Sequence, residues 1–187
     1  IVKAMNGQRV TIRSLDIGAD KPSELLTAGF GDTAASALGL RGIRLALIET
    51  DVLVTQFRAM LRVAADGPIR ILLPMVSNVS EVYRARELLK KAATQLKRRK
   101  IAVPDPLPPL GVMIEVPGAA LAADALAQAS DFFAIGSNDL TMYTLAVDRA
   151  NEHVAHLFDP LHPAVLRLIQ FATSAALRGR IPISICG

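Results

Sequence analysis

Short apolar runs alternate with longer amphipathic runs along the chain. The short runs are rich in β-branched residues and are bounded by turn formers, which is typical of buried strands. In the longer runs the apolar residues recur at helical spacing. The pattern predicts strands at residues 10–17, 69–76, 110–116, 131–136 and 181–186. It predicts helices at residues 42–65, 81–100, 119–129 and 162–177.

Strands that alternate with helices favour an α/β fold with a parallel sheet and right-handed crossovers. Both a doubly wound sheet and a (β/α)₈ barrel fit this order of elements. A complete barrel takes about 250 residues, whereas this chain has 187 residues and five predicted strands. If the fold is a barrel, the chain is an incomplete fragment of it. Residues 22–40, which are rich in small residues and turn formers, are expected to form a loop.

Composition indicates one folded domain outside the membrane. Apolar residues make up 51% of the chain, and charged residues interrupt every apolar run. No run reaches the roughly 20 residues that a membrane-spanning helix needs. The chain opens without the pattern of a secretory signal, and the single Cys186 cannot close an intrachain disulfide. We therefore expect a protein of the reducing cytoplasm.

The net charge of +4 and the pI near 9.6 raise the question of nucleic-acid binding. Many of the cations, however, lie toward the C-terminus of the helix predicted at 81–100, where the helix dipole favours them. Aromatic residues that could stack on bases are absent there. We interpret this segment as a solvated helix face and expect no nucleic-acid partner; a basic patch for a nucleic acid or another partner is the alternative.

Unusual polar residues stand inside or just after the apolar strands. Arg13 interrupts the first strand, Glu115 ends the third, Asn138 and Asp139 follow the fourth, and Cys186 ends the fifth. In a parallel barrel the carboxyl ends of the strands share one face. These side chains are therefore expected to meet in one pocket.

The residue types in this set indicate a magnesium site for an anionic substrate. Glu115 and Asp139 offer hard oxygen ligands without His or Cys at metal-ligand spacing, which suits Mg²⁺ better than zinc. Arginine matches phosphate and carboxylate groups bidentately. Further cations stand elsewhere in the sequence: Lys21, Arg41 and Arg149.

Each of these residues also has an ordinary interpretation. Glu115 could be a carboxylate at a loop edge, and Asp139 could cap a turn that begins at Leu140. Arg41 could line an exposed helix start, and Cys186 could be a small buried apolar residue. Their shared position at strand ends favours the functional interpretation, which is an Mg²⁺-dependent site for a phosphorylated acid.

Several runs of residues carry a resemblance to a known family. They are TIRSLDIGADKP, LGLRGIRLAL, QFRAMLRVAADGPIRILLPMVS, GVMIEVPGAA, DFFAIGSNDLTMYTLAVDRANEHVAHLFDPLHPAVLRLI and ISICG. They closely resemble the phosphoenolpyruvate-binding domain of Enzyme I of the bacterial sugar phosphotransferase system. The runs occur in that family's order and cover nearly the whole chain. The chain also resembles multiphosphoryl transfer proteins, in which an Enzyme I module is fused to phosphocarrier modules.

The resemblance implies a phosphoenolpyruvate/pyruvate-binding (β/α)₈ barrel, of which residues 1–187 are a part. It assigns phosphoenolpyruvate binding to Arg13 and Arg149, with Asn138 and Asp139 also at the substrate, while Lys21 and Arg41 match substrate-binding positions nearby. Glu115 and Asp139 would hold Mg²⁺, and Cys186 would protonate the enolate carbon.

The resemblance also implies what lies outside the chain. Two barrel strands would precede Ile1, one would follow Gly187, and the phosphorylatable histidine would lie on another domain. The implied partners are phosphoenolpyruvate and pyruvate, that histidine domain, the HPr phosphocarrier and a second copy in a homodimer. Two glycines of the family are alanines here, Ala19 and Ala150. Each matters if its backbone needs a positive φ.

Two alternatives stay open. A pyruvate-phosphate dikinase or a phosphoenolpyruvate synthase uses a similar barrel, and an ATP-binding domain elsewhere in the whole protein would identify either. A non-catalytic regulatory or dimerisation module could keep the barrel without turnover, and pyruvate formation by the whole protein would exclude it.

Overall fold

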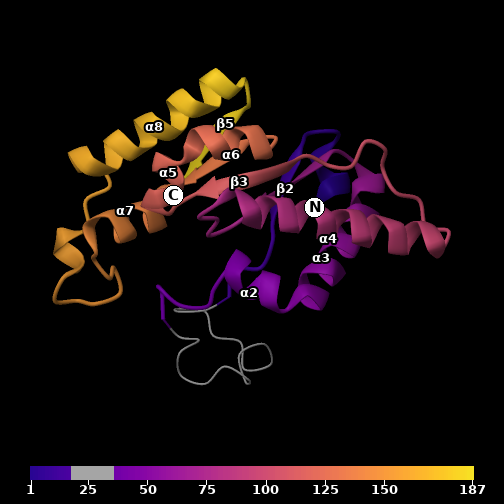
Figure 1. Ribbon diagram of the computed structural model, residues 1–187, viewed down its shortest axis with the longest axis horizontal. Coiled ribbons are helices and arrows are strands. Elements are labelled where there is room, and N and C mark those ends of the chain that lie inside the picture. Colours follow the sequence, from indigo (N-terminus) through magenta and orange to yellow (C-terminus); the bar gives the residue numbers. More distant parts are fainter. Residues whose placement is uncertain (18–35) are drawn as a thin grey trace. The chain divides into compact units, whose positions relative to one another are not determined.

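The computed structural model describes residues 1–17 and 36–187, which form two compact units. The first unit comprises Ile1–Met75 and Tyr83–Leu110, and the second comprises Val76–Val82 and Gly111–Gly187. Figure 1 labels the helices and strands of both.

The first unit is built on two parallel strands. Its elements are η1 (Val2–Met5), β1 (Val10–Arg13), α2 (Ile43–Ile48), α3 (Thr50–Val63), η3 (Ala64–Asp66) and β2 (Ile69–Leu73). β1 pairs with β2 from Val10 opposite Ile69 to Arg13 opposite Leu72. β2 is largely buried, whereas β1 alternates half-buried and exposed residues and exposes Thr11 and Arg13. Arg13 is thus held at the carboxyl end of β1.

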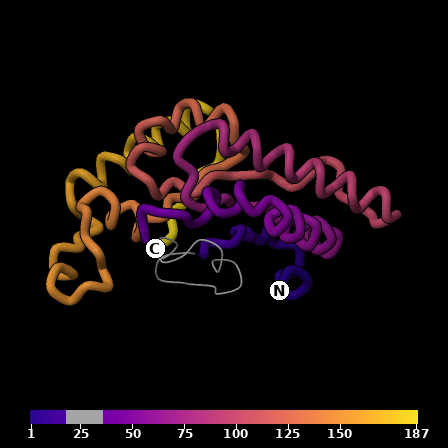
Figure 2. The backbone as a smooth tube through the Cα atoms, turned by 60° about the horizontal axis from the view of Figure 1, so that its bottom comes forward, coloured from indigo at the N-terminus to yellow at the C-terminus, as the bar shows by residue number. Residues whose placement is uncertain are grey.

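Helices cover this pair of strands with apolar faces. α3 buries Leu53, Phe57 and Leu61, which recur every four residues and therefore share one face. The long helix α4 (Val79–Arg98) begins in the second unit and continues in the first, and Figure 2 traces it as one unbroken coil. Its start is capped, because the Glu81 carboxylate accepts hydrogen bonds from the backbone N–H groups of Ser77 and Asn78.

The second unit is built on three parallel strands. Its elements are β3 (Leu110–Ile114), α5 (Pro117–Leu121), α6 (Ala123–Ala129), β4 (Phe133–Gly136), α7 (Ser137–Leu145), η4 (Ala155–Leu157), α8 (Pro163–Gly179) and β5 (Ile183–Cys186). β4 pairs with β3 on one side and with β5 on the other. β3 and β4 are completely buried, whereas β5 is mostly exposed. α8 packs against α5 and α6 (Figure 1).

The predicted fold is confirmed in its elements. All five predicted strands are present, alternate with helices and pair in parallel within each unit. Within each unit every strand pairs with the next one along the sequence. A doubly wound sheet needs a point where the strand order reverses, and neither unit contains one. This order agrees with an incomplete barrel.

The predicted helices need three corrections. The helix expected at 42–65 is interrupted at Glu49, and the helix expected at 119–129 is interrupted at Ala122, because the backbone leaves the helical region at both residues. Residues 137–145 form α7, although we predicted no helix there. α7 buries only Leu140 and Thr141, so its sequence carries no apolar stripe from which a helix could be recognised.

Two further predictions concern loops and membranes. Of the loop predicted at 22–40, residues 22–35 lie outside the described residues, and residues 36–40 form no helix or strand. In the described part of the chain, none of the helices combines the length and the apolar character that a membrane crossing requires.

Gly111, the second residue of β3, allows a test of the packing in the second unit. A Cβ atom at Gly111 would overlap the ring of Phe132, which is 1% exposed and cannot move away. Overpacking of this kind costs about 1–3 kcal/mol. We expect Gly111→Ala to destabilise the domain by that amount, measured as the shift of its urea unfolding transition in the full-length protein. Gly118→Ala is the control, because a Cβ atom there meets nothing within 4 Å; equal stability of the two variants would contradict this account.

Candidate functional site

Three strand ends of the second unit form a row. Ile114 of β3 is opposite Ile135 of β4, so Glu115 and Gly136 are the next residues on these neighbouring strands. Gly136 is in turn opposite Cys186 of β5. Glu115 and Cys186 thus lie at the ends of the two strands that pair with β4, on either side of Gly136.

Gly136 leaves room for the Glu115 side chain. A Cβ atom at Gly136 would lie 2.7 Å from Glu115 Oε2 and 3.0 Å from Glu115 Cβ. Glu115 is only 1% exposed, and a buried carboxylate is costly unless a cation or hydrogen-bond donors compensate its charge. Burial excludes the interpretation of Glu115 as an ordinary carboxylate at a loop edge.

Helix α7 begins directly after β4 and carries two of the predicted residues. Asn138 and Asp139 lie in its first turn and are half-buried. Gly136 occupies the N-cap position, so the interpretation of Asp139 as the cap of a turn beginning at Leu140 is wrong. The partial positive charge at a helix N-terminus stabilises a carboxylate in the first turn.

Cys186, the last residue of β5, is exposed in this structure. Its thiol donates to the backbone carbonyl of Ile135 at 3.4 Å. The backbone carbonyl of Cys186 accepts a hydrogen bond from Ser137 Oγ at 3.3 Å. The end of β5 is therefore attached both to β4 and to the first residue of α7.

Arg149 lies in an exposed turn that follows α7. Asp148 organises this turn, because its side chain accepts a hydrogen bond from the N–H of Ala150 at 2.9 Å and its carbonyl accepts one from Asn151 at 3.1 Å. Ala150 is not among the described residues with a positive φ. The turn at Arg149 therefore does not need the glycine that the resemblance implies at position 150.

The first unit brings together Arg13 and Arg41. Both contact the carboxylate of Asp16: Arg41 donates through Nε at 3.2 Å and through Nη2 at 2.8 Å, and Arg13 Nη1 lies 3.6 Å from Asp16 Oδ2. The side chains of Asp16 and Arg41 are 3% and 7% exposed, whereas that of Arg13 is 38% exposed. Burial excludes Arg41 as a residue of an exposed helix start. Lys21 lies outside the described residues.

Asp16 is a residue that the sequence analysis missed. The sequence gives only a weak signal for it, a carboxylate three residues after Arg13 in the same strand-like run. Gly42 lets the carboxylate approach: its φ of 54° is unfavourable for other residues, and a Cβ atom there would lie 3.2 Å from Asp16 Oδ1 and 2.8 Å from Met75 Cβ.

A further cation lies near Arg13 in the first unit. Arg70 of β2 donates through Nε to Thr11 Oγ1 at 2.7 Å, and Thr11 precedes Arg13 by two residues on the same face of β1. Burial, together with the charge of Arg9, lowers the pKa of Arg70. Arginine nevertheless keeps its charge in proteins, so this face of β1 is cationic.

The donor set of the second unit fits magnesium. Among residues 1–17 and 36–187 no group of three or more His, Cys, Asp and Glu side chains could hold a metal ion by itself. Mg²⁺ does not need such a group, because it usually takes one or two carboxylates and completes its shell with water and substrate oxygens. Glu115, buried in the space left by Gly136, and Asp139 are carboxylates of the required type.

Comparison with known proteins extends these observations. The family model described as "PEP-utilising enzyme, PEP-binding domain" matches residues 1–187. Proteins named phosphoenolpyruvate-protein phosphotransferase are similar over the whole chain, with 48% identity in Cupriavidus necator, 42% in Geobacillus stearothermophilus and 39% in Listeria monocytogenes. The chain spans about a third, 32%, of the length of these curated relatives.

A solved structure supports the fold alone. A citrate lyase from Burkholderia xenovorans superimposes with a TM-score of 0.53 over 99% of this chain and 66% of that chain. Its sequence is 18% identical, so the likeness says nothing about the reaction. It confirms that the five strands and their helices form part of an α/β barrel.

Gly136 also generates a test of the site. We expect Gly136→Ala to displace the Glu115 carboxylate, because the new methyl group would lie 2.7 Å from Oε2. A change in a residue that positions a metal ligand typically lowers metal affinity about 10- to 100-fold. The measurement is Mn²⁺ binding to the full-length protein by electron paramagnetic resonance, with phosphoenolpyruvate present. Gly118→Ala is again the control, and unchanged Mn²⁺ affinity in Gly136→Ala would remove Glu115 from the metal site.

Proposed function

The chain belongs to the family of the PEP-binding domain of PEP-utilising enzymes, and we propose that it is the substrate-binding part of a phosphoenolpyruvate-protein phosphotransferase, Enzyme I. The observation that carries the proposal is the row of strand ends in the second unit, where Glu115 and Cys186 flank Gly136. The names of the relatives, all phosphoenolpyruvate-protein phosphotransferases, support this enzyme over a dikinase or a synthase.

Phosphoenolpyruvate carries a phosphate and a carboxylate, and both need cations. We assign these contacts to Arg13 and Arg149, whose exposed guanidinium groups can form bidentate hydrogen bonds to either anion. Asn138 and Asp139, in the first turn of α7, would contact the substrate as well. Lys21 completes the proposed set of residues at the substrate. Arg41, which the resemblance assigns to the same set, has its fork on Asp16.

Glu115 and Asp139 would hold Mg²⁺ together with substrate oxygens. The ion would neutralise charge on the phosphoryl group and on the developing enolate. The buried position of Glu115 supports this role, because a cation offsets the cost of a carboxylate away from water.

The proposed reaction transfers the phosphoryl group to a histidine on another domain of the whole protein. A histidine nitrogen attacks phosphorus, the bond between phosphorus and the enol oxygen breaks, and the enolate of pyruvate leaves. Arg13 and Arg149 would orient the phosphoryl group and balance its charge. Cys186 would then give its thiol proton to the enolate carbon, which yields pyruvate. The position of the thiol at a strand end, opposite Gly136, supports this role.

The partners and the location of the whole protein follow from the same proposal. The phosphohistidine would pass its phosphoryl group to the HPr phosphocarrier, either free or fused to the enzyme. The full-length protein would act as a homodimer in the cytoplasm. A non-catalytic module is the rival function, and no feature of the described site favours it.

The test is formation of pyruvate from phosphoenolpyruvate by the full-length protein with HPr and Mg²⁺. We expect Asp139→Ala to abolish this activity, because the change removes a metal ligand and a substrate contact together. Asp131→Ala is the control, because Asp131 is an exposed carboxylate before β4, at the opposite end of that strand. A wild-type protein that forms no pyruvate would refute the enzymatic function, and an active Asp139→Ala variant would refute the role of Asp139 alone.

Cys186 supplies a separate prediction. We expect Cys186→Ala to slow steady-state pyruvate formation by a general-acid factor of about 10²–10⁴, while the Kd for phosphoenolpyruvate changes little. Phosphoenolpyruvate with Mg²⁺ should also protect the wild-type thiol from alkylation, followed by mass spectrometry. Normal turnover of the alanine variant, together with alkylation that ignores substrate, would mean that the proton comes from another group.

A further inference from the structure

We propose that Asp16 is a positioning residue that, held by the buried Arg41, aims the exposed Arg13 at the anionic substrate. Arg41 then acts through Asp16 rather than by direct contact with substrate. The inference rests on the proposed function, because it takes Arg13 as a phosphoenolpyruvate ligand. It adds a residue, Asp16, and redefines the part that Arg41 plays.

The Arg41–Asp16 pair has the geometry of a two-point ion pair. Arg41 grips both carboxylate oxygens, with Nε on Oδ1 at 3.2 Å and Nη2 on Oδ2 at 2.8 Å. This side-on fork is rigid and specific for a carboxylate. It also commits two donors of Arg41 to Asp16, and the Arg41 side chain is 7% exposed. Because Arg41 is buried and two of its donors already bind Asp16, it is poorly suited to binding a ligand that enters from solvent.

One carboxylate oxygen of Asp16 serves both arginines. Asp16 Oδ2 accepts the hydrogen bond from Arg41 Nη2 and lies 3.6 Å from Arg13 Nη1. The Asp16 side chain is 3% exposed and that of Arg13 is 38% exposed. Asp16, the most buried of the three, therefore joins the buried Arg41 to the more exposed Arg13.

Asp16 divides its carboxylate between two cations. Arg41 makes the closer contact, at 2.8 Å, and Arg13 lies 3.6 Å away. The fork of Arg41 therefore compensates the buried charge of Asp16, and Asp16 can orient Arg13 without holding it in a closed hydrogen-bonded pair.

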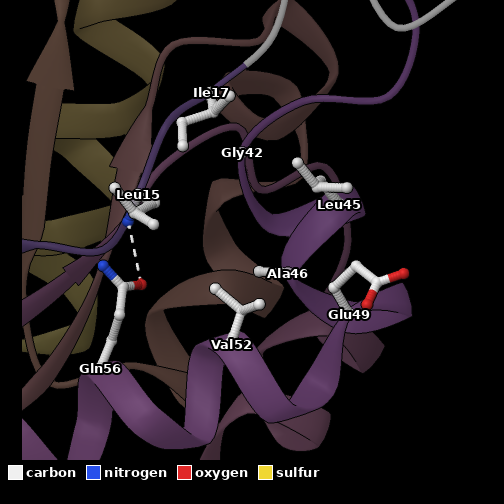
Figure 3. Close-up of a pocket in the computed structure, with 8 residues that line it drawn as sticks. All are labelled: Leu15, Ile17, Gly42, Leu45, Ala46, Glu49, Val52 and Gln56. Atoms are coloured by element: carbon white, nitrogen blue, oxygen red, sulfur yellow. Dashed lines mark hydrogen bonds between the residues drawn. The ribbon is translucent and has the colours of Figure 1, made fainter. Parts of the chain in front are cut away.

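The segment that carries Asp16 is itself held in place on two sides. The backbone N–H of Leu15 donates to Gln56 Oε1 of α3 at 3.2 Å, as Figure 3 shows. On the other side Gly42 supports the carboxylate, because only a residue without Cβ fits between Met75 and Asp16 Oδ1. Gly42 also lines the same pocket as Leu15 and Gln56 (Figure 3). A positioning residue needs such support, because its orientation is the property that it passes on.

The test is a double-mutant cycle in the full-length protein. Its arms are Asp16→Asn and Arg13→Ala, singly and together, and the readout is the Kd for phosphoenolpyruvate with Mg²⁺ by calorimetry. Asp16→Asn keeps the size of the side chain but removes its charge. We expect it to weaken binding about 10-fold with Arg13 present and to have no further effect once Arg13 is Ala, because residues that act through one another are not additive.

Asp124→Asn is the matched control. Asp124 is gripped by Arg178 in the same forked manner, at 2.7–3.0 Å, but the pair is exposed and belongs to the second unit. We expect this variant to bind phosphoenolpyruvate like the wild type. If Asp16→Asn does not fold, Arg41→Lys replaces it in the cycle, because lysine keeps the charge and loses the fork.

The outcomes separate the two proposals. Loss of affinity that disappears in the Arg13→Ala background supports the positioning role. Equal loss in both backgrounds, or no loss at all, overturns it and leaves the proposed function standing. A wild-type protein that does not bind phosphoenolpyruvate refutes the proposed function itself, and the role of Asp16 fails with it.

Discussion

The parallel hydrogen bonding of β3, β4 and β5 is the constraint on which the candidate site depends. It fixes Ile114 opposite Ile135 and Gly136 opposite Cys186. Residues at the ends of neighbouring parallel strands then lie side by side, whatever their separation in sequence. A slip of one residue would turn every side chain of a strand to the other face. The buried apolar residues of β3 and β4 prevent such a slip, so the core of the second unit determines where Glu115 and Cys186 lie.

Two glycines, which have no side chain, matter to the site as much as its charged residues do. Gly136 and Gly42 each stand where a Cβ atom would press on a carboxylate, that of Glu115 in one unit and that of Asp16 in the other. Both carboxylates are nearly inaccessible to solvent. A buried carboxylate must be compensated. Arg41 compensates Asp16 with a forked pair of hydrogen bonds. For Glu115 we propose that a metal ion joins its surroundings together with the substrate.

The strands could be predicted from the sequence more accurately than the helices and side chains that lie near the strand ends. β-Branched runs bounded by turn formers identify buried strands, and all five are present. Helix α7 was missed because it buries only Leu140 and Thr141 and shows no apolar stripe. The breaks at Glu49 and Ala122 leave the helical periodicity of neighbouring residues intact, so the pattern does not reveal them. Asp16 escaped for a different reason, since a carboxylate three residues after an arginine is common and only the fold shows that Arg41 closes on it.

Burial sorts the arginines in a way that residue type alone could not. The sequence places Arg13, Arg41 and Arg149 in one class, as candidates for an anionic substrate. In the structure Arg13 and Arg149 are exposed, whereas Arg41 is buried with its fork on Asp16. A cation that already neutralises an internal carboxylate has no net charge to offer a ligand, although it can decide the orientation of a neighbour that has. The affinity of this site for an anion should therefore depend on how firmly the guanidinium groups of Arg13 and Arg149 are held before the ligand arrives.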